Sequence, residues 1–372
     1  MARPRRKPLA ALRQLALFAP GGRISACSAV EMLRQEIGTD AAILFWLDSQ
    51  ANPIDATLCT PVPYAVLHDY MENFAPHPHL EMATGMTLRL AQRTVKKVCP
   101  NSLVSDHACY ARSEFFNRIG KPTGFGFRSL IPLRHANGKP LASLNLGREF
   151  SSADFAADEL ALLEQAHDWI EHLLLRESDD VSAGQWESSG ESAMAILDAD
   201  GKVLSASRGA MTLLHQAADT AHHGAQLKRS ALGDTAHLLR RVAGTVGAAL
   251  RDLPAFPPSL TLVNRWGRFH LRAYVMDAGE RGAPFQISLH VERRLPLTLR
   301  LFKSSGFLRL SLREREVALL ALSGMSYTEI AARLGIKPST VIYFTRQIHN
   351  KLNVSRQSEL LSALLRDDPP IS

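Results

Sequence analysis

The chain has 372 residues, of which 46% are hydrophobic and 21% are charged. This composition is ordinary for a globular protein, and the length predicts two or three domains. The formal net charge of +7 indicates an acidic partner. No apolar run approaches the ~20 residues of a membrane-spanning helix, so we expect a cytoplasmic protein with no membrane partner.

The first 24 residues predict a basic arm followed by an amphipathic helix. The opening MARPRRKP is rich in arginine and lysine, and the apolar LAALRQLALFAP behind it contains Arg13. A charged residue inside the apolar stretch argues against a secretory signal peptide. The four cysteines lack the C-x-x-C spacing of zinc and redox sites, so we expect reduced thiols and no metal site. They are Cys27, Cys59, Cys99 and Cys109.

The next predicted elements are strands and helices in mixed order. Residues 41–47 (AAILFWL) predict a buried strand. Two apolar runs at 126–134 and 139–147 flank Asn137-Gly138, a dipeptide that strongly indicates a hairpin turn. An amphipathic helix is predicted at 158–175, where leucine, alanine and isoleucine recur at helical spacing.

Residues 25–175 resemble a GAF-type sensory domain. The resemblance rests on residues 128–132 and 141–146 for the hairpin, and on residues 150–166 for the helix that follows it. Domains of this type bind small molecules or dimerise through their terminal helices. The resemblance therefore implies a small-molecule ligand or a contact between two copies of the chain.

A second sensory unit is predicted after a polar, serine-rich linker at 176–192. Residues 193–206 (AMAILDADGKVLSA) predict two strands joined by an Asp-Gly turn, and residues 193–292 resemble a PAS-type domain. The flavin-binding cysteine motif and a persuasive haem histidine are missing, so no cofactor is expected. Residues 293–309 predict a basic linker, in which every second residue from 297 to 301 is leucine, as in a short strand.

Residues 310–366 predict an all-helical domain. Its third helix has one apolar stripe at helical spacing, formed by Val341, Phe344, Ile348 and Leu352. Gly335 predicts a tight turn before this helix, and Ser326 can cap the helix that precedes the turn. Two short helices joined by a glycine turn, the second with a polar outer face, are the helix-turn-helix pattern.

The side of the third helix opposite Val341 predicts a DNA-contacting surface. Its side chains are donors and acceptors that suit base edges and phosphates, and Thr340 could offer its hydroxyl and backbone N–H to a phosphate. Basic residues concentrate in the same C-terminal part, as contact with a polyanion requires. The candidate DNA-binding residues are Lys337, Ser339, Thr340, Ile342, Tyr343, Arg346, Gln347, Asn350 and Lys351.

Residues 310–366 also resemble the LuxR/FixJ-type helix-turn-helix family. The resemblance implies a four-helix domain that binds double-stranded DNA as a homodimer paired through its fourth helix, with RNA polymerase as a partner of an activator. The sequence departs from the family pattern at Lys337, Ile342 and Gln357, which leaves the operator sequence open. The motifs that carry the resemblance are LSLREREV at 310–317, Gly324, Glu329-Ile330-Ala331, Thr340-Val341 and Lys351-Leu352.

The predicted fold class is therefore α+β sensory domains, GAF-like and then PAS-like, followed by an all-α LuxR-type helix-turn-helix domain. No G-x-S-x-G, H-E-x-x-H or Walker A motif is present, so we expect a DNA-binding transcription regulator rather than an enzyme. Two alternatives stay open. One is a module that acts with RNA polymerase, like the promoter-reading part of a sigma factor. The other is a regulator that binds an acylated lactone in an aromatic pocket formed by Trp46, Tyr64, Tyr70 and Phe74.

Overall fold

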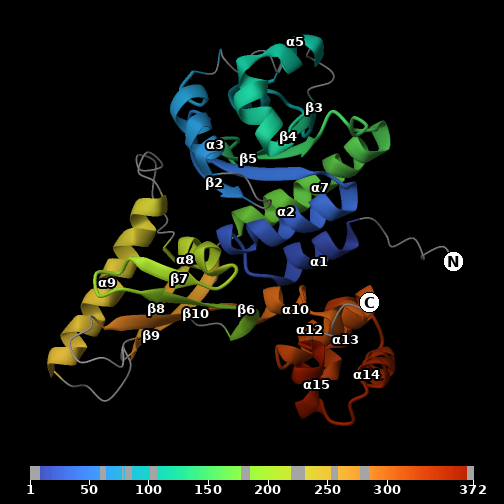
Figure 1. Ribbon diagram of the computed structural model, residues 1–372. Helices are drawn as coiled ribbons and strands as arrows, with labels where there is room; N and C mark the ends of the chain where they lie inside the picture. The colour runs from blue at the N-terminus through green and yellow to red at the C-terminus, as the bar shows by residue number, and fades with distance from the viewer. Residues whose placement is uncertain are drawn as a thin grey trace.

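The computed structural model describes residues 9–58, 64–77, 79, 86–100, 107–176, 185–218, 231–252, 259–276 and 285–366. Within them, two five-stranded antiparallel sheets with flanking helices are followed by a helical C-terminal domain (Figure 1). The predicted α+β N-terminal region and helical C-terminal domain are confirmed. The GAF-like and PAS-like identities of the two sheet domains stay predictions.

The first sheet has the strand order β2-β1-β5-β4-β3. Its strand β1 (Ala41–Leu47) is buried along its whole length, as the apolar run predicted, because helices cover both faces of the sheet. β4 (Phe127–Arg134) and β5 (Pro140–Arg148) form the predicted hairpin. Gly138 supplies the φ of 78° at its turn. The remaining strands are β2 (Pro53–Leu58) and β3 (Cys99–Pro100).

Alternate residues of β1 divide between two apolar cores, one on each face of the sheet. Leu44 and Trp46 belong to the first core, whereas Ile43 and Phe45 belong to the second. The first face is covered by α1 (Ala10–Phe18), α2 (Arg23–Ile37) and α7 (Ala157–Leu175). The second face carries α3 (Tyr64–Asp69), η1 (Tyr70–Phe74), α4 (Leu88–Arg93), α5 (His107–Arg112), η4 (Phe116–Gly120) and α6 (Lys121–Thr123).

The second sheet has the order β7-β6-β10-β9-β8, which corresponds strand by strand to the order of the first sheet. Two helices, α8 (Ala210–Ala218) and α9 (Ala231–Asp252), cover one of its faces. On that face Leu197, Leu271 and Leu289 join the core. The strands are β6 (Trp186–Leu197), β7 (Val203–Ala206), β8 (Ser259–Asn264), β9 (Gly267–Met276) and β10 (Gln286–Pro296).

Both predicted linkers contain regular structure, which corrects the sequence interpretation. Residues 186–192 are the first part of β6, where Ser188 and Ser192 pair with β10. Their polar composition reflects a largely exposed strand rather than a linker. The leucines expected to form a strand after residue 296 instead form α10 (Leu297–Leu301), because Pro296 has no N–H with which to extend the ladder. The short helix α11 (Ser305–Leu308) follows.

The C-terminal helices begin and end at residues that satisfy their free backbone groups. Ser326 Oγ accepts the backbone N–H of Glu329, so the predicted cap is confirmed. Gly335 has a φ of 65° and makes the predicted turn in the left-handed conformation. The helices are α12 (Leu312–Leu322), α13 (Tyr327–Leu334), α14 (Pro338–Leu352) and α15 (Gln357–Leu364). No helix in the described ranges is long and apolar enough to cross a membrane.

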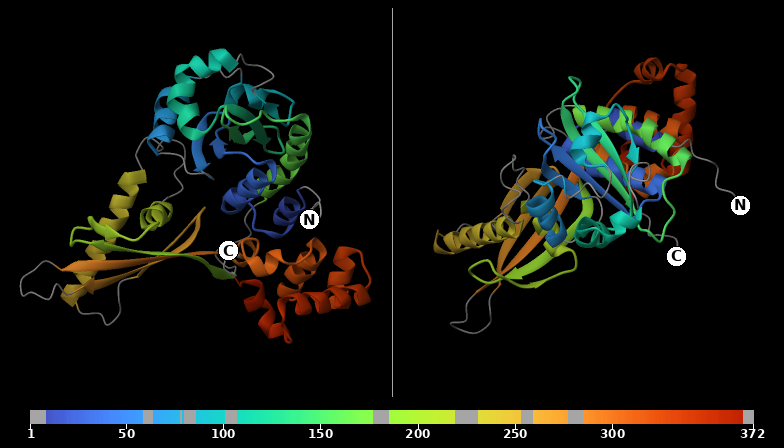
Figure 2. Two further views of the ribbon diagram at one scale, coloured as in Figure 1. Left: turned by 45° about the vertical axis from the view of Figure 1, so that its right-hand side comes forward. Right: turned by 90° about the horizontal axis from the view of Figure 1, so that it is seen from above.

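The C-terminal domain packs against α1 of the first sheet domain (Figures 1 and 2). Leu12 and Leu15 of α1 belong to the same continuous core as Leu310 and Val317. The second sheet domain contacts the first through Asp55 of β2, which pairs with Arg23 at 2.6 Å and also with Arg265 in the turn between β8 and β9. The first sheet domain therefore contacts both other parts of the chain directly.

Candidate nucleic-acid interface

Helix α14 is fixed in orientation by its buried stripe. Val341, Ile348 and Leu352 are buried, and Phe344 between them is half-buried. The helix packs against α12 and α13, so the opposite side faces outward. The predicted core side of this helix is therefore confirmed, and its outer side is available for contact with a partner.

Six of the predicted DNA-binding residues are exposed on α14. Tyr343 is 56% exposed and Ile342 is 38% exposed, although both carry apolar or aromatic groups. An exposed aromatic ring next to an exposed branched aliphatic chain leaves apolar surface in water, which a bound partner would cover. The exposed polar candidates on the helix are Ser339, Arg346, Asn350 and Lys351, whereas Thr340 and Gln347 are half-buried.

The N-terminus of α14 favours an anion. Lys337 stands at the N-cap, where its side chain makes no capping hydrogen bond, and no acidic residue lies in the first turn. The positive end of the helix dipole is therefore not offset by a carboxylate. Thr340 N donates to Lys337 O over 2.9 Å, so the expected backbone donor is already used and only the Thr340 hydroxyl is left for a phosphate.

Lys351 differs from the other candidates because it already holds a carboxylate. Its Nζ lies 2.7 Å from Glu314 Oε2, and the Glu314 side chain is only 5% exposed. Burial raises the pKa of Glu314, but hydrogen bonds from Lys351 and Ser311 outweigh this effect and leave the pKa below its ordinary value. Lys351 therefore joins α14 to α12, a role that the sequence analysis missed.

Two basic residues of the C-terminal part, Arg300 and Arg315, are buried and so add nothing to a DNA-facing surface. Arg315 donates to the backbone carbonyls of Leu308 at 2.7 Å and Leu310 at 3.1 Å. Arg300 Nε donates to Ser188 O over 2.8 Å. Both arginines hold the chain segment before α12 in place. The capping Ser311-x-x-Glu314 pattern was the signal that Glu314 lies at a helix start, but nothing local indicated that Arg315 is buried.

A small apolar cavity of about 40 Å³ lies between the first sheet and its second helical layer. Phe45, Tyr70, Phe115 and Asn145 contribute to its lining. The lining includes residues of η1 and η4, which are π-helical turns of the kind that occurs often at functional sites.

The aromatic pocket expected for a lactone is not assembled as the sequence suggested. Trp46 lies on the other face of the sheet, where its Nε1 donates to Thr57 Oγ1 over 3.0 Å and Arg23 stacks on its ring. Tyr70 and Phe74 do belong to the core beside the cavity. The Tyr64 side chain lies outside the described residues. Of the three residues whose side chains are described, only Tyr70 lines the cavity.

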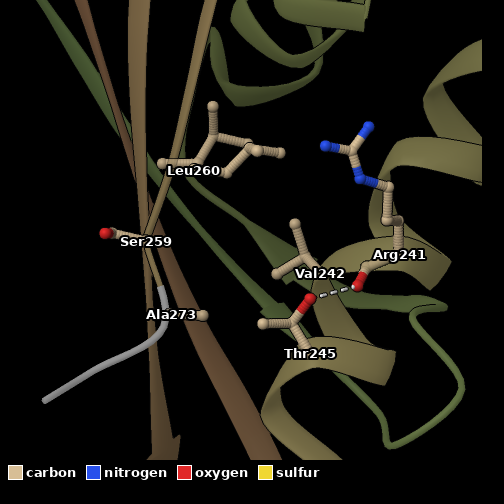
Figure 3. A pocket seen from close by; sticks show the side chains of 7 residues that line it. Arg241, Val242, Thr245, Ser259, Leu260 and Ala273 are labelled. Carbon is tan, nitrogen blue, oxygen red and sulfur yellow. Dashed lines mark hydrogen bonds between the residues drawn. The ribbon is translucent and has the colours of Figure 1, made fainter.

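The second sheet domain has a cavity of about 80 Å³ between α9 and strands β8 and β9. Figure 3 shows Val242 and Leu260 facing one another across it, with Arg241 at one side. Thr245 Oγ1 donates to Arg241 O over 2.9 Å, so this hydroxyl is used within its own helix.

No group of three or more metal-binding side chains occurs within the described ranges. Cys27 is half-buried, Cys99 is buried and Cys109 is exposed, and none of these three forms a disulfide. Cys59 lies outside the described residues.

Comparisons with known proteins agree with the helical geometry. The family described as "Bacterial regulatory proteins, luxR family" matches residues 308–364. No curated protein gave a significant match to the chain.

Several solved structures share remote similarity with the chain. The Vibrio cholerae VqmA dimer without target DNA is 16% identical, with 48% of this chain and 90% of that chain covered and a TM-score of 0.19. A Vibrio cholerae VqmA–ligand–DNA complex is 13% identical, with 47% and 83% covered and a TM-score of 0.22. The sensor region of a sensor histidine kinase is 14% identical, with 72% and 92% covered and a TM-score of 0.19. These TM-scores are too low to carry an argument about fold or function.

The family match and the arrangement of α12 to α15 concern the same residues. The match carries α13, the Gly335 turn and the outward face of α14, which are the parts of a helix-turn-helix. Residues 308–364 form a helix-turn-helix domain of the luxR family, which makes this chain a DNA-binding transcription regulator.

Proposed function

We propose that the chain binds operator DNA as a dimer and inserts α14 into the major groove. The observation that carries this proposal is the outward face of α14, where Ser339, Tyr343, Arg346 and Asn350 are exposed opposite the buried Val341 stripe. An α-helix fits the major groove, where each base pair has a distinct pattern of donors and acceptors.

The residues of α14 take different roles in this proposal. Arg346 can donate two hydrogen bonds to a guanine edge or bind a phosphate. Ile342 and Tyr343 offer apolar contact to a thymine methyl group. Lys337 and the Thr340 hydroxyl bind phosphate at the helix N-terminus. Gln347 and Asn350 lie farther along the helix, and Lys351 contributes mainly by holding Glu314.

Dimerisation is proposed through α15. Leu360, Ala363 and Leu364 of this helix are buried within the domain, whereas Leu361 and Leu365 are half-buried one turn apart. Two such leucines on one face can pack against the same pair of a second copy. A dimer of this kind would read an inverted repeat, with the half-sites spaced by the helical turn of DNA.

The sheet domains are proposed to sense a small molecule. The cavity beside Tyr70 is apolar, but its volume of about 40 Å³ is well below the roughly 300–1,000 Å³ of small-molecule sites, so a bound compound would require it to widen. RNA polymerase is a proposed partner if the protein activates transcription.

Selection of bound fragments from random DNA tests this proposal with the full chain. We expect enrichment of one inverted-repeat sequence without RNA polymerase, and no enrichment by Arg346→Ala. Equal enrichment by the variant would contradict the assignment of α14. Enrichment only when RNA polymerase core is present would favour the sigma-factor-like alternative.

A further inference from the structure

Residues 1–8 (MARPRRKP), which we call the basic arm, carry four positive charges. Arg3, Arg5, Arg6 and Lys7 are basic, and no aspartate or glutamate occurs among the eight residues. Short runs rich in arginine and lysine are typical of segments that bind nucleic acid. The basic arm itself lies outside the described residues, whereas the residues that follow it are described.

The basic arm joins the described chain at Leu9, beside the DNA-binding domain. Leu9 is 8% exposed and belongs to the same continuous core as Leu310 of that domain. Helix α1 begins at the next residue and packs against α12, where Gln14 Nε2 donates to Leu312 O over 2.6 Å. The point of attachment is therefore held in place between the first sheet domain and the DNA-binding domain.

The point of attachment lies in the same groove as two residues of α14. This groove of about 690 Å³ is lined by Leu9 and Ala10 on one side, and by Phe344 and Lys351 on the other. Eight residues of extended chain span at most about 26–29 Å. Helix α14 has 15 residues and is therefore about 22 Å long. The basic arm is thus long enough to reach DNA that this helix contacts.

Several cations of the DNA-binding domain are already held by carboxylates or by the backbone. Lys351 pairs with Glu314 and Arg313 pairs with Glu316, each over 2.7 Å. Arg315 is buried on two backbone carbonyls. These residues contribute little to the neutralisation of DNA phosphates, so four further cations beside α14 would add substantially to the affinity.

We propose that the basic arm binds the phosphates of the operator DNA next to the site that α14 reads. Because phosphate contacts carry no sequence information, the arm increases affinity without changing which sequence is preferred. The proposal rests on the proposed function, in that α14 determines where the arm lies on the DNA. Since Leu9 packs with the first sheet domain, a shift of α1 on α12 would also move the arm relative to α14.

Neutralising the basic arm in the full chain tests the proposal. Binding is measured by fluorescence anisotropy at several salt concentrations, with the selected operator and with a scrambled duplex of the same length. At about 0.15 M salt the arm variant should bind both duplexes about tenfold or more weakly, and its log–log salt slope should be less steep by about 2–4 per bound chain. The arm variant combines Arg3→Gln, Arg5→Gln, Arg6→Gln and Lys7→Gln.

A matched control removes the same charge from exposed positions of the second sheet domain. It should bind both duplexes like the wild type. Unchanged affinity and slope in the arm variant, or equal losses in the arm variant and the control, would overturn the proposal. The control combines Lys202→Gln, Arg208→Gln, Arg240→Gln and Arg272→Gln.

Cleavage by a tethered iron chelator locates the basic arm on the DNA. The reagent is attached to Ala2→Cys, and the wild type treated with the same reagent shows the cleavage that its own cysteines cause. We expect additional cleavage of the operator by the variant, and its absence would also contradict the proposal. Arg346→Ala should lose the preference for the operator over the scrambled duplex, whereas the arm variant should keep it. Failure of the proposed function and failure of the arm contact are therefore distinguishable.

Discussion

Gln14 on α1 donates a hydrogen bond from Nε2 to the carbonyl oxygen of Leu312 on α12, over 2.6 Å. Gln14 is 2% exposed, and its Oε1 has no hydrogen-bond partner within the described part of the chain. The buried Oε1 costs free energy because it has no hydrogen-bond partner, whereas the hydrogen bond of Nε2 favours one particular packing of the two domains. The contact between the first sheet domain and the DNA-binding domain is therefore specific without being as stable as a fully apolar boundary.

Gln14→Ala is expected to loosen this boundary. The substitution removes one hydrogen bond worth about 1 kcal/mol, so amide exchange in α1 and α12 should accelerate by about fivefold. Gln35→Ala is the control, because Gln35 is exposed and bonds only to Glu31 of its own helix at 2.7 Å in the described structure. Unchanged exchange in α12 of the Gln14 variant would show that the bond does not hold the domains together.

Lys351→Met is expected to destabilise the C-terminal domain. The change leaves the buried Glu314 carboxylate without its ammonium partner, which should lower the free energy of unfolding by roughly 1–3 kcal/mol after allowance for the partly exposed lysine. Arg313→Met removes the partner of Glu316 from an exposed pair and should cost less than about 1 kcal/mol. Urea unfolding followed by circular dichroism measures both values. Equal losses would mean that Glu314 does not depend on Lys351.

The same carboxyl predicts a pH dependence with a defined sign. The folded-state pKa of Glu314 lies below its ordinary value. Its contribution to the free energy of unfolding is therefore fully present above the unfolded-state pKa of about 4.3. It is lost as the pH falls through the lower folded-state pKa.

In Lys351→Met burial raises the pKa of Glu314 without the lysine to oppose it. The stability difference between wild type and variant should therefore be largest near pH 7 and shrink toward pH 4. Urea titrations at several pH values measure the difference. A difference that grows as the pH falls would contradict this account.

The helix-turn-helix could be predicted because its signals are local. The Val341 stripe, the Ser326 cap and the Gly335 turn each lie within a few residues of the feature they determine, and all three agree with the structure. The hairpin at Gly138 was predictable for the same reason. Local patterns therefore sufficed to orient α14 and to place its outer face.

The tertiary partners of charged residues could not be predicted in this way. Lys351 on α14 pairs with Glu314 on α12, which is 37 residues away in sequence. Gln14 bonds to Leu312, which is 298 residues away. The strand at 186–192 was hidden because its serines are exposed on one face and pair with β10, which lies about a hundred residues later. Such pairings depend on the whole fold rather than on spacing.

The contribution of Arg346 to operator affinity tests the central claim most directly. Binding of the selected operator should be measured by fluorescence anisotropy at several salt concentrations for wild type, Arg346→Ala and Arg272→Ala. Arg272 is the matched control, because it is an exposed arginine of β9 that lies outside the C-terminal domain.

We expect Arg346→Ala to lose about tenfold or more in affinity. If Arg346 binds a phosphate, the log–log salt slope should also become about 0.9 less steep. Arg272→Ala should match the wild type. Wild-type affinity in the Arg346 variant at every salt concentration would contradict the account that α14 reads the DNA.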